Sequence, residues 1–141
     1  MLKENNSSHK QINEKIYTHL EAVKYLGANF VIYSSGNCIN KKKANCTSLS
    51  GIRQLTLNRI KDLQIKVGIK LVITGGTETG HSLSKYSHQN GYKVDLRTLK
   101  ELNTYIANNY EKVNDYLYLD PFGNTYHRHG PSDHWDVLIT H

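Results

Sequence analysis

The sequence has few cysteines and no long run of apolar residues. Only two of its 141 residues are cysteine, Cys38 and Cys46, and they lack the Cys-x-x-Cys spacing of zinc fingers. Its apolar segments are far shorter than the roughly 20 residues that a helix needs to cross a membrane. The polar start lacks the apolar centre of a signal peptide. We expect no membrane span, and either no export by that route or a leader already removed.

The two cysteines lie in a loop that is rich in Asn, Ser and Lys. This composition offers neither sulfur an apolar site, so it favours a disulfide between Cys38 and Cys46 over two free thiols in a reducing cytosol. Disulfides persist in oxidising compartments. We therefore expect an extracytoplasmic protein.

The charge balance is basic. Eighteen Lys and Arg residues stand against twelve Asp and Glu residues, for a net charge of +6. Such a surface favours an anionic partner, for example a nucleic acid, an anionic lipid or an acidic polymer. No zinc-finger, helix-turn-helix or RNA-binding signature accompanies the charge, which disfavours nucleic acid. The segment Gly75–Gly80 lacks the Gly-Lys-Ser/Thr of a phosphate loop and is expected to be a structural turn.

The length is that of one domain. Composition predicts a disordered tail over residues 1–10 and a single domain over 11–141. Apolar spacing predicts helices over residues 10–26, from Ser48 or Ser50 to Gly68, and over 98–112. Strands are expected over residues 30–33, 69–74, 92–96, 116–119 and 133–140, with a turn-rich connection over 121–131. This order predicts an α+β fold, a small antiparallel sheet flanked by helices.

In the segment 87–95, a histidine and an aspartate, His88 and Asp95, are separated by six residues that include Gly91. Gly91 permits a turn that folds His88 back toward Asp95. In the last strand His134 and Asp136 share a face, because alternate residues of a strand do so. If the two strands are neighbours, His88, Asp95 and one or both of the last-strand residues converge. Such donors suit a zinc ion with one position left for water. The plainer interpretation is a hydrogen-bonded clamp without metal.

The pattern Ser-His-x-x-Gly-x-x-x-Asp at residues 87–95, followed by His-Trp-Asp at 134–136, resembles the zinc D-Ala-D-Ala carboxypeptidase superfamily. That superfamily also includes phage endolysin L-alanyl-D-glutamate peptidases and the hedgehog signalling domain. The resemblance covers roughly residues 70–140 and implies the fold of this family, with His88 and Asp95 as zinc ligands. It also implies a zinc metallopeptidase that cleaves stem or cross-link peptides of peptidoglycan, located in the cell wall after secretion or lysis. The basic charge suits an anionic cell-wall polymer.

The third ligand is open between two residues. Alignment with the family's His-x-His element places Asp136 at the ligand position and His134 at an accessory one. Imidazole is the better zinc donor, however, so we favour His134, with Asp136 as base or supporting partner. The family's general base, a glutamate shortly before the last ligand, is missing, so Asp133 or Asp136 has to replace it. The family's substrate-positioning arginine is also missing, and Thr77 and Glu78 occupy that turn.

Other residues are candidates for the same site. His81 could line the cleft and donate to a developing oxyanion, or be an exposed loop residue. His127 and His129 alternate on an expected strand, where they could bind substrate or an extra metal, or form a solvated face. We count them with Thr77 and Glu78 as candidate substrate-binding residues. The alternative function is a non-catalytic, zinc-containing, cell-wall-binding module on the same scaffold, consistent with the missing glutamate and arginine.

Overall fold

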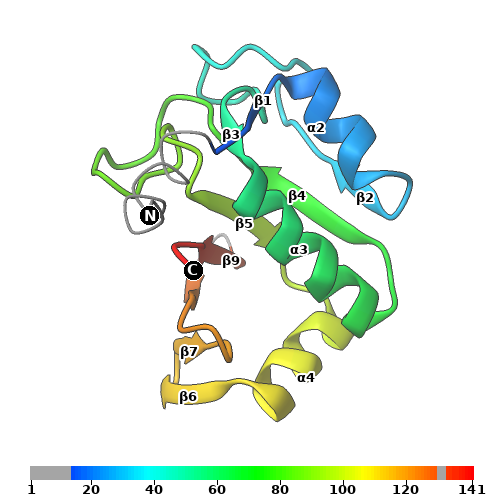
Figure 1. The fold of residues 1–141 in the computed structure, drawn as a ribbon, viewed down its shortest axis with the longest axis vertical. Helices are drawn as coiled ribbons and strands as arrows, with labels where there is room; N and C mark the ends of the chain where they lie inside the picture. Colours follow the sequence, from blue (N-terminus) through cyan, green and yellow to red (C-terminus); the bar gives the residue numbers. More distant parts are fainter. Residues whose placement is uncertain (1–13, 130–132) are drawn as a thin grey trace, which may run out of the picture.

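A seven-stranded sheet forms the centre of the protein (Figure 1). The computed structural model describes residues 14–129 and 133–141. The strand order is β2-β4-β5-β9-β8-β7-β6, and a separate two-stranded sheet joins β1 to β3. The expected tail over residues 1–10 lies outside the described residues.

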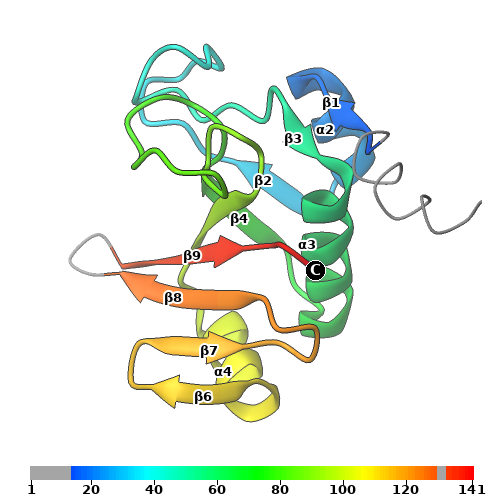
Figure 2. The ribbon, with the colours of Figure 1, turned by 60° about the vertical axis from the view of Figure 1, so that its left-hand side comes forward.

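The large sheet is mixed. Its strands are β2 (Phe30–Ile32), β4 (Leu71–Gly75), β5 (Lys93–Arg97), β6 (Glu111–Asn114), β7 (Leu117–Leu119), β8 (Thr125–His129) and β9 (His134–Leu138). β2 and β4 run parallel, and all the other neighbouring pairs run antiparallel. Figure 2 shows β9, β8, β7 and β6 side by side. The α+β class is confirmed. The prediction of an antiparallel sheet was wrong for one pair, because α3 connects β2 to its parallel neighbour β4.

Three helices accompany the sheets in the described part of the chain: α2 (His19–Leu26), α3 (Gln54–Val67) and α4 (Lys100–Asn109). α2 begins at a capping box, in which the Thr18 hydroxyl accepts from the Glu21 amide and the Glu21 carboxylate accepts from the Thr18 amide. α2 starts later than expected, because β1 (Ile16–Tyr17) pairs with β3 (Ile52–Arg53). No helix among these residues is long and apolar enough to cross a membrane.

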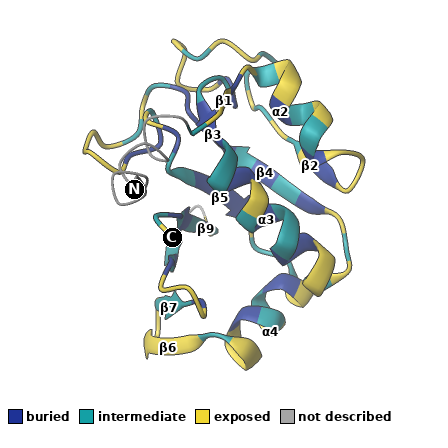
Figure 3. Ribbon diagram, in the orientation of Figure 1, coloured by how far each residue is buried: buried dark blue, intermediate teal, exposed yellow. Residues whose placement is uncertain are grey.

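The two faces of the sheet differ in chemistry. Val94 and Leu96 of β5 and Val137 of β9 are fully buried in one apolar core with residues of α3 and α4. Each such side chain stabilises the fold by roughly 1.5–3 kcal/mol on burial. Figure 3 shows this buried centre and the exposed edge strand β6. Because strand residues alternate, Asp95 and Asp136 point to the opposite face.

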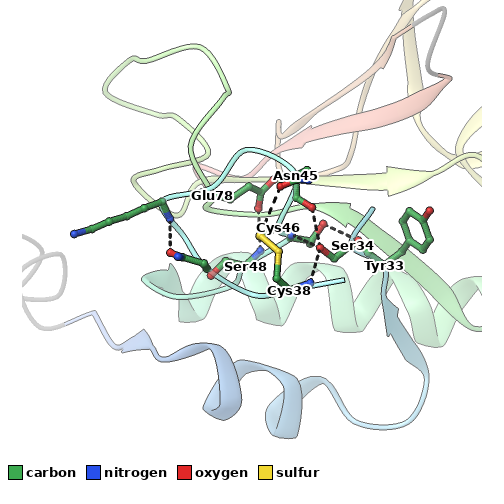
Figure 4. The surroundings of a disulfide bond; sticks show 10 residues. Tyr33, Ser34, Cys38, Asn45, Cys46, Ser48 and Glu78 are labelled. Atoms are coloured by element: carbon green, nitrogen blue, oxygen red, sulfur yellow. Dashed lines mark hydrogen bonds between the residues drawn. A yellow bond between two sulfur atoms is a disulfide. The ribbon is translucent and has the colours of Figure 1, made fainter. Parts of the chain in front are cut away.

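Two long connections, residues 33–51 and 76–92, are bonded to each other. The predicted disulfide between Cys38 and Cys46 is confirmed and closes the first connection (Figure 4). Next to it, the Ser34 hydroxyl donates to the Asn45 carbonyl at 2.9 Å. The Ser48 carbonyl then accepts from the Thr77 amide at 2.6 Å, so the first connection supports the second. Ser48 therefore braces a turn rather than capping α3, which begins at Gln54.

A pair of glycines tests how closely these connections pack. Gly91 has φ +85°, and an added Cβ would lie 2.5 Å from the Gly51 carbonyl oxygen, whereas Gly68 has φ +82° and open space around it. We expect Gly68→Ala to lower the free energy of unfolding by about 1–2 kcal/mol, the cost of the left-handed backbone. Gly91→Ala should cost clearly more, because backbone atoms must also move. Urea denaturation measures both, and equal losses would contradict the close packing.

Candidate metal centre

The candidate site residues lie on three neighbouring strands of the sheet. β9 lies between β5 and β8, and the register sets Asp136 directly opposite Asp95 on one side and His127 on the other. In the next row His134 lies between Arg97 and His129. The Asp95 strand is therefore a neighbour of the last strand, which meets the condition set from the sequence, and the pairing brings all these residues to one face.

His88 reaches this face from the loop before β5. The turn is closed by the Gly91 amide, which donates to the His88 carbonyl at 2.9 Å. The imidazole is buried, and its Nδ1 donates to the Gly76 carbonyl oxygen at 2.9 Å. This bond fixes the tautomer, so the lone pair of Nε2 faces the carboxylates. Nε2 lies 3.3 Å from Asp95 Oδ1 and 3.6 Å from Asp136 Oδ1.

Two carboxylate oxygens at this point are short of partners. Within the described part of the chain, Asp95 Oδ1 and Asp136 Oδ1 are the buried side-chain oxygens that accept no hydrogen bond. Buried carboxylates are costly unless charge or hydrogen bonds compensate them. Their position beside His88 Nε2 requires a positive charge there, either a proton on His88 or a metal ion.

The pKa values of this cluster follow from the same geometry. Burial by itself would lower the pKa of His88, but the neighbouring carboxylates of Asp136 and Asp95 outweigh it and raise the pKa to about 9. Burial would likewise raise the pKa of Asp136, but His88 and Lys93 lower it to about 2. Without metal, the cluster is therefore an imidazolium between carboxylates at neutral pH.

The remaining carboxylate contacts come from side chains around the rim. His134 Nε2 lies 3.6 Å from Asp95 Oδ1, and His129 Nε2 lies 3.6 Å from Asp136 Oδ2. Lys93 Nζ lies 3.4 Å from the same Asp136 oxygen. Sequence reasoning did not include Lys93 in the site, although its place two residues before Asp95 puts it on the same face.

His81 joins the cluster from the turn before His88. Its ring stacks on that of His88, with the ring centroids 3.7 Å apart. Donor atoms of His81, His88 and Asp95 all lie within 4.8 Å of one another, and this group could hold a metal ion. His81 Nε2 is held by Glu78 Oε2 at 2.7 Å, so Nδ1 is the ring nitrogen left for other partners.

Thr77 and Glu78, the candidate substrate-binding residues of the turn, are buried. The Glu78 carboxylate accepts from the amides of Ser48 and Gly76 as well as binding His81. Burial raises the pKa of Glu78, but these hydrogen bonds outweigh it and lower the pKa overall. The Thr77 hydroxyl donates to backbone carbonyls. The structure thus places both residues in support of the turn, away from any surface that a substrate could touch.

Asp133 and the β8 histidines lie at the edge of the site. The Asp133 carboxylate binds Arg128 Nε at 3.0 Å and accepts from the Thr98 hydroxyl at 3.0 Å, so it is engaged away from His88. His127 Nδ1 lies 2.8 Å from His129 Nε2. Burial, followed by the charge of His129, lowers the pKa of His127.

The cluster opens into a cavity of about 310 Å³, lined by His81, His88, Asp95, His134 and Asp136 among others. A cavity of this size admits part of a peptide. Comparisons with models of protein families, with curated proteins and with solved structures found no match. Any assignment of function therefore depends on the residues themselves.

The raised pKa of His88 predicts a pH dependence of stability in the metal-free protein. A raised His88 pKa stabilises the fold fully below pH 6.5, and this contribution is lost as the pH rises toward 9. We expect the free energy of unfolding with chelator present to be larger at pH 6 than at pH 9, by on the order of 1–3 kcal/mol. His88→Gln should remove this difference, whereas His141→Gln should retain it. Denaturant titrations at the two pH values measure the effect. If His88→Gln kept the same difference in free energy of unfolding between the two pH values, the prediction would be contradicted.

Proposed function

We propose that the protein is a zinc metallopeptidase that cleaves stem or cross-link peptides of peptidoglycan. The observation that carries the proposal is the pair of buried oxygens, Asp95 Oδ1 and Asp136 Oδ1, that face the Nε2 of His88 without accepting a hydrogen bond. A divalent cation would satisfy both oxygens and the imidazole lone pair together. The motif at residues 87–95 and 134–136 supports zinc and the substrate class.

The distances from His88 to the two carboxylates fit such an ion. Ligand atoms about 2.0 Å from a tetrahedral zinc lie about 3.3 Å apart. His88 Nε2 lies 3.3 Å from Asp95 Oδ1 and 3.6 Å from Asp136 Oδ1. The burial and missing hydrogen bond of Asp136 Oδ1 support Asp136 as the third ligand, in place of His134, which donor chemistry favoured. His134 then takes the accessory position beside Asp95.

Zinc bound here would polarise the scissile carbonyl and lower the pKa of a bound water. The chain supplies the remaining functions. The Gly76 carbonyl oxygen accepts a hydrogen bond from Nδ1 of His88 and so orients the ring, as such bonds do for metal-binding histidines. Asp133 is engaged by Arg128, and Asp136 is committed to the ion. His81 lines the same cavity, and its Nε2 donates to Glu78, so its Nδ1 carries a lone pair. His81 is therefore our candidate for accepting the proton of the attacking water rather than for donating to an oxyanion.

The setting of the site supports a substrate outside the cytoplasm. The disulfide Cys38–Cys46 is typical of oxidising compartments, and the net charge of +6 favours contact with an anionic cell-wall polymer. The alternative is a non-catalytic, zinc-containing, cell-wall-binding module. The engagement of Asp133 by Arg128 favours that alternative, because it removes one replacement for the family's glutamate base.

Metal content and hydrolysis together test the proposal. We expect one zinc per chain by plasma mass spectrometry and release of amino groups from purified peptidoglycan. His88→Ala and Asp95→Asn should lose both, because each removes a ligand. Asp115→Asn, at an exposed carboxylate, should change neither. Zinc without released amino groups would favour the binding module, and a wild type without zinc would leave only the protonated clamp.

The choice of third ligand is tested by a matched pair of variants. We expect Asp136→Asn to weaken zinc binding by at least tenfold, since a neutral amide replaces a charged ligand. His134→Gln should bind zinc within a fewfold of wild type while hydrolysing peptide more slowly. Competition with a chromogenic chelator measures the affinity. If His134→Gln weakened zinc binding more than Asp136→Asn did, His134 rather than Asp136 would be the third ligand.

A further inference from the structure

A second cavity of about 340 Å³ adjoins the metal centre on its other side. It shares Asp95 and His134 with the first cavity, so a ligand that reaches the ion extends into it. Its wall also includes Tyr33, Thr74 and Arg97. The continuation of the site is therefore a polar cavity that contains one arginine.

Arg97 is placed to face this cavity by the sheet. It lies on β5 two residues after Asp95, and it pairs across the sheet with His134. Its guanidinium lies over the ring of Tyr33, 5.0 Å from the ring centroid. An aromatic face restricts a guanidinium without using its hydrogen-bond donors. Arg97 is thus oriented, with its donors left for a ligand.

The charge of Arg97 is not balanced by a neighbouring carboxylate. Among residues 14–129 and 133–141, no ion pair involves Arg97. Asp133 also lines the cavity, but its carboxylate is bound by Arg128 and Thr98. A planar guanidinium with free donors is suited to bidentate binding of a carboxylate. The cavity therefore favours an anionic, carboxylate-bearing end of a ligand.

We propose that Arg97 binds the C-terminal carboxylate of the substrate and makes this protein a carboxypeptidase rather than an endopeptidase. The inference rests on the proposed function. Asp95 and Arg97 lie on the same face of β5, where alternate Cα atoms are about 6.8 Å apart, and both line this cavity, so a short terminal segment of a ligand can contact both. Neither the motif at 87–95 nor the turn at 77–78 supplies this contact.

The reaction that follows is hydrolysis of the last peptide bond. The hydroxyl of water joins the scissile carbonyl carbon, the C–N bond breaks, and a proton goes to the leaving amine. The products are a peptide one residue shorter, with a new carboxylate, and a free amino acid whose carboxylate Arg97 has held.

A pair of peptides that differ only at their C-terminus tests the proposal. The probes are N-acetyl-Lys-D-Ala-D-Ala and its C-terminal amide, given to the zinc-loaded protein. We expect kcat/KM for the acid to exceed that for the amide by about 100-fold, since one charged hydrogen-bonding pair is lost. Arg97→Met should lower kcat/KM for the acid by a similar factor, mainly through KM, and leave the amide unaffected. Arg97→Lys should recover part of the loss.

Arg59 offers the matched control, because its guanidinium also lies over an aromatic ring, that of Phe122, and lines a different cavity. Arg59→Met should stay within twofold of wild type on both peptides. Circular dichroism of each variant checks that the fold is retained.

Binding without metal separates this inference from the proposed function. In chelator-treated, ¹⁵N-labelled protein, the acid should shift the Arg97 Nε resonance, whereas the amide should not. Equal hydrolysis of both peptides, or an unaffected Arg97→Met, would overturn the carboxylate site and leave the peptidase standing. Shifts with the acid but no hydrolysis of either peptide would overturn the peptidase and leave the site. Neither shifts nor hydrolysis would overturn both.

Discussion

Two carboxylates face each other across neighbouring strands, and the rest of the site depends on this arrangement. The register of β5 and β9 sets Asp95 opposite Asp136 with their oxygens buried, where like charges repel. A cation between the carboxylates would offset this repulsion. The buried His88, held through its other nitrogen by Gly76, delivers either that cation itself or a lone pair for one.

The loops above the sheet are built to hold this imidazole in place. The disulfide closes the first connection, whose Ser48 binds both Thr77 and Glu78 of the second. Glu78 in turn binds His81, which stacks on His88. A line of contacts therefore runs from a covalent cross-link to the candidate metal centre, although the cysteines are far from His88 in the sequence.

The sequence predicted which residues form the candidate site better than it predicted the hydrogen bonds and ion pairs that surround them. Strand alternation and Gly91 predicted which side chains share a face, because these rules are local. That the two strands are neighbours entered only as a condition, since the pairing of β5 with β9 is a long-range contact. Burial of Thr77 and Glu78 depends on the loop that carries Ser48, and capture of Asp133 by Arg128 depends on the pairing of β8 with β9. Such long-range contacts leave no periodic signal, and for the same reason the parallel pairing of β2 with β4 was not predicted.

The imidazolium of His88 has a consequence for how the protein is assembled. Because a proton on His88 would offset the two carboxylates as a metal ion would, folding would not require an ion to be bound first. If the site binds a metal ion as proposed, loading would be an exchange, in which the incoming ion displaces a proton that is bound more tightly than on an ordinary histidine. Acidic surroundings would keep the folded chain empty, and alkaline ones would open it to metal. Metal binding would thus depend on the pH around the chain after it has folded.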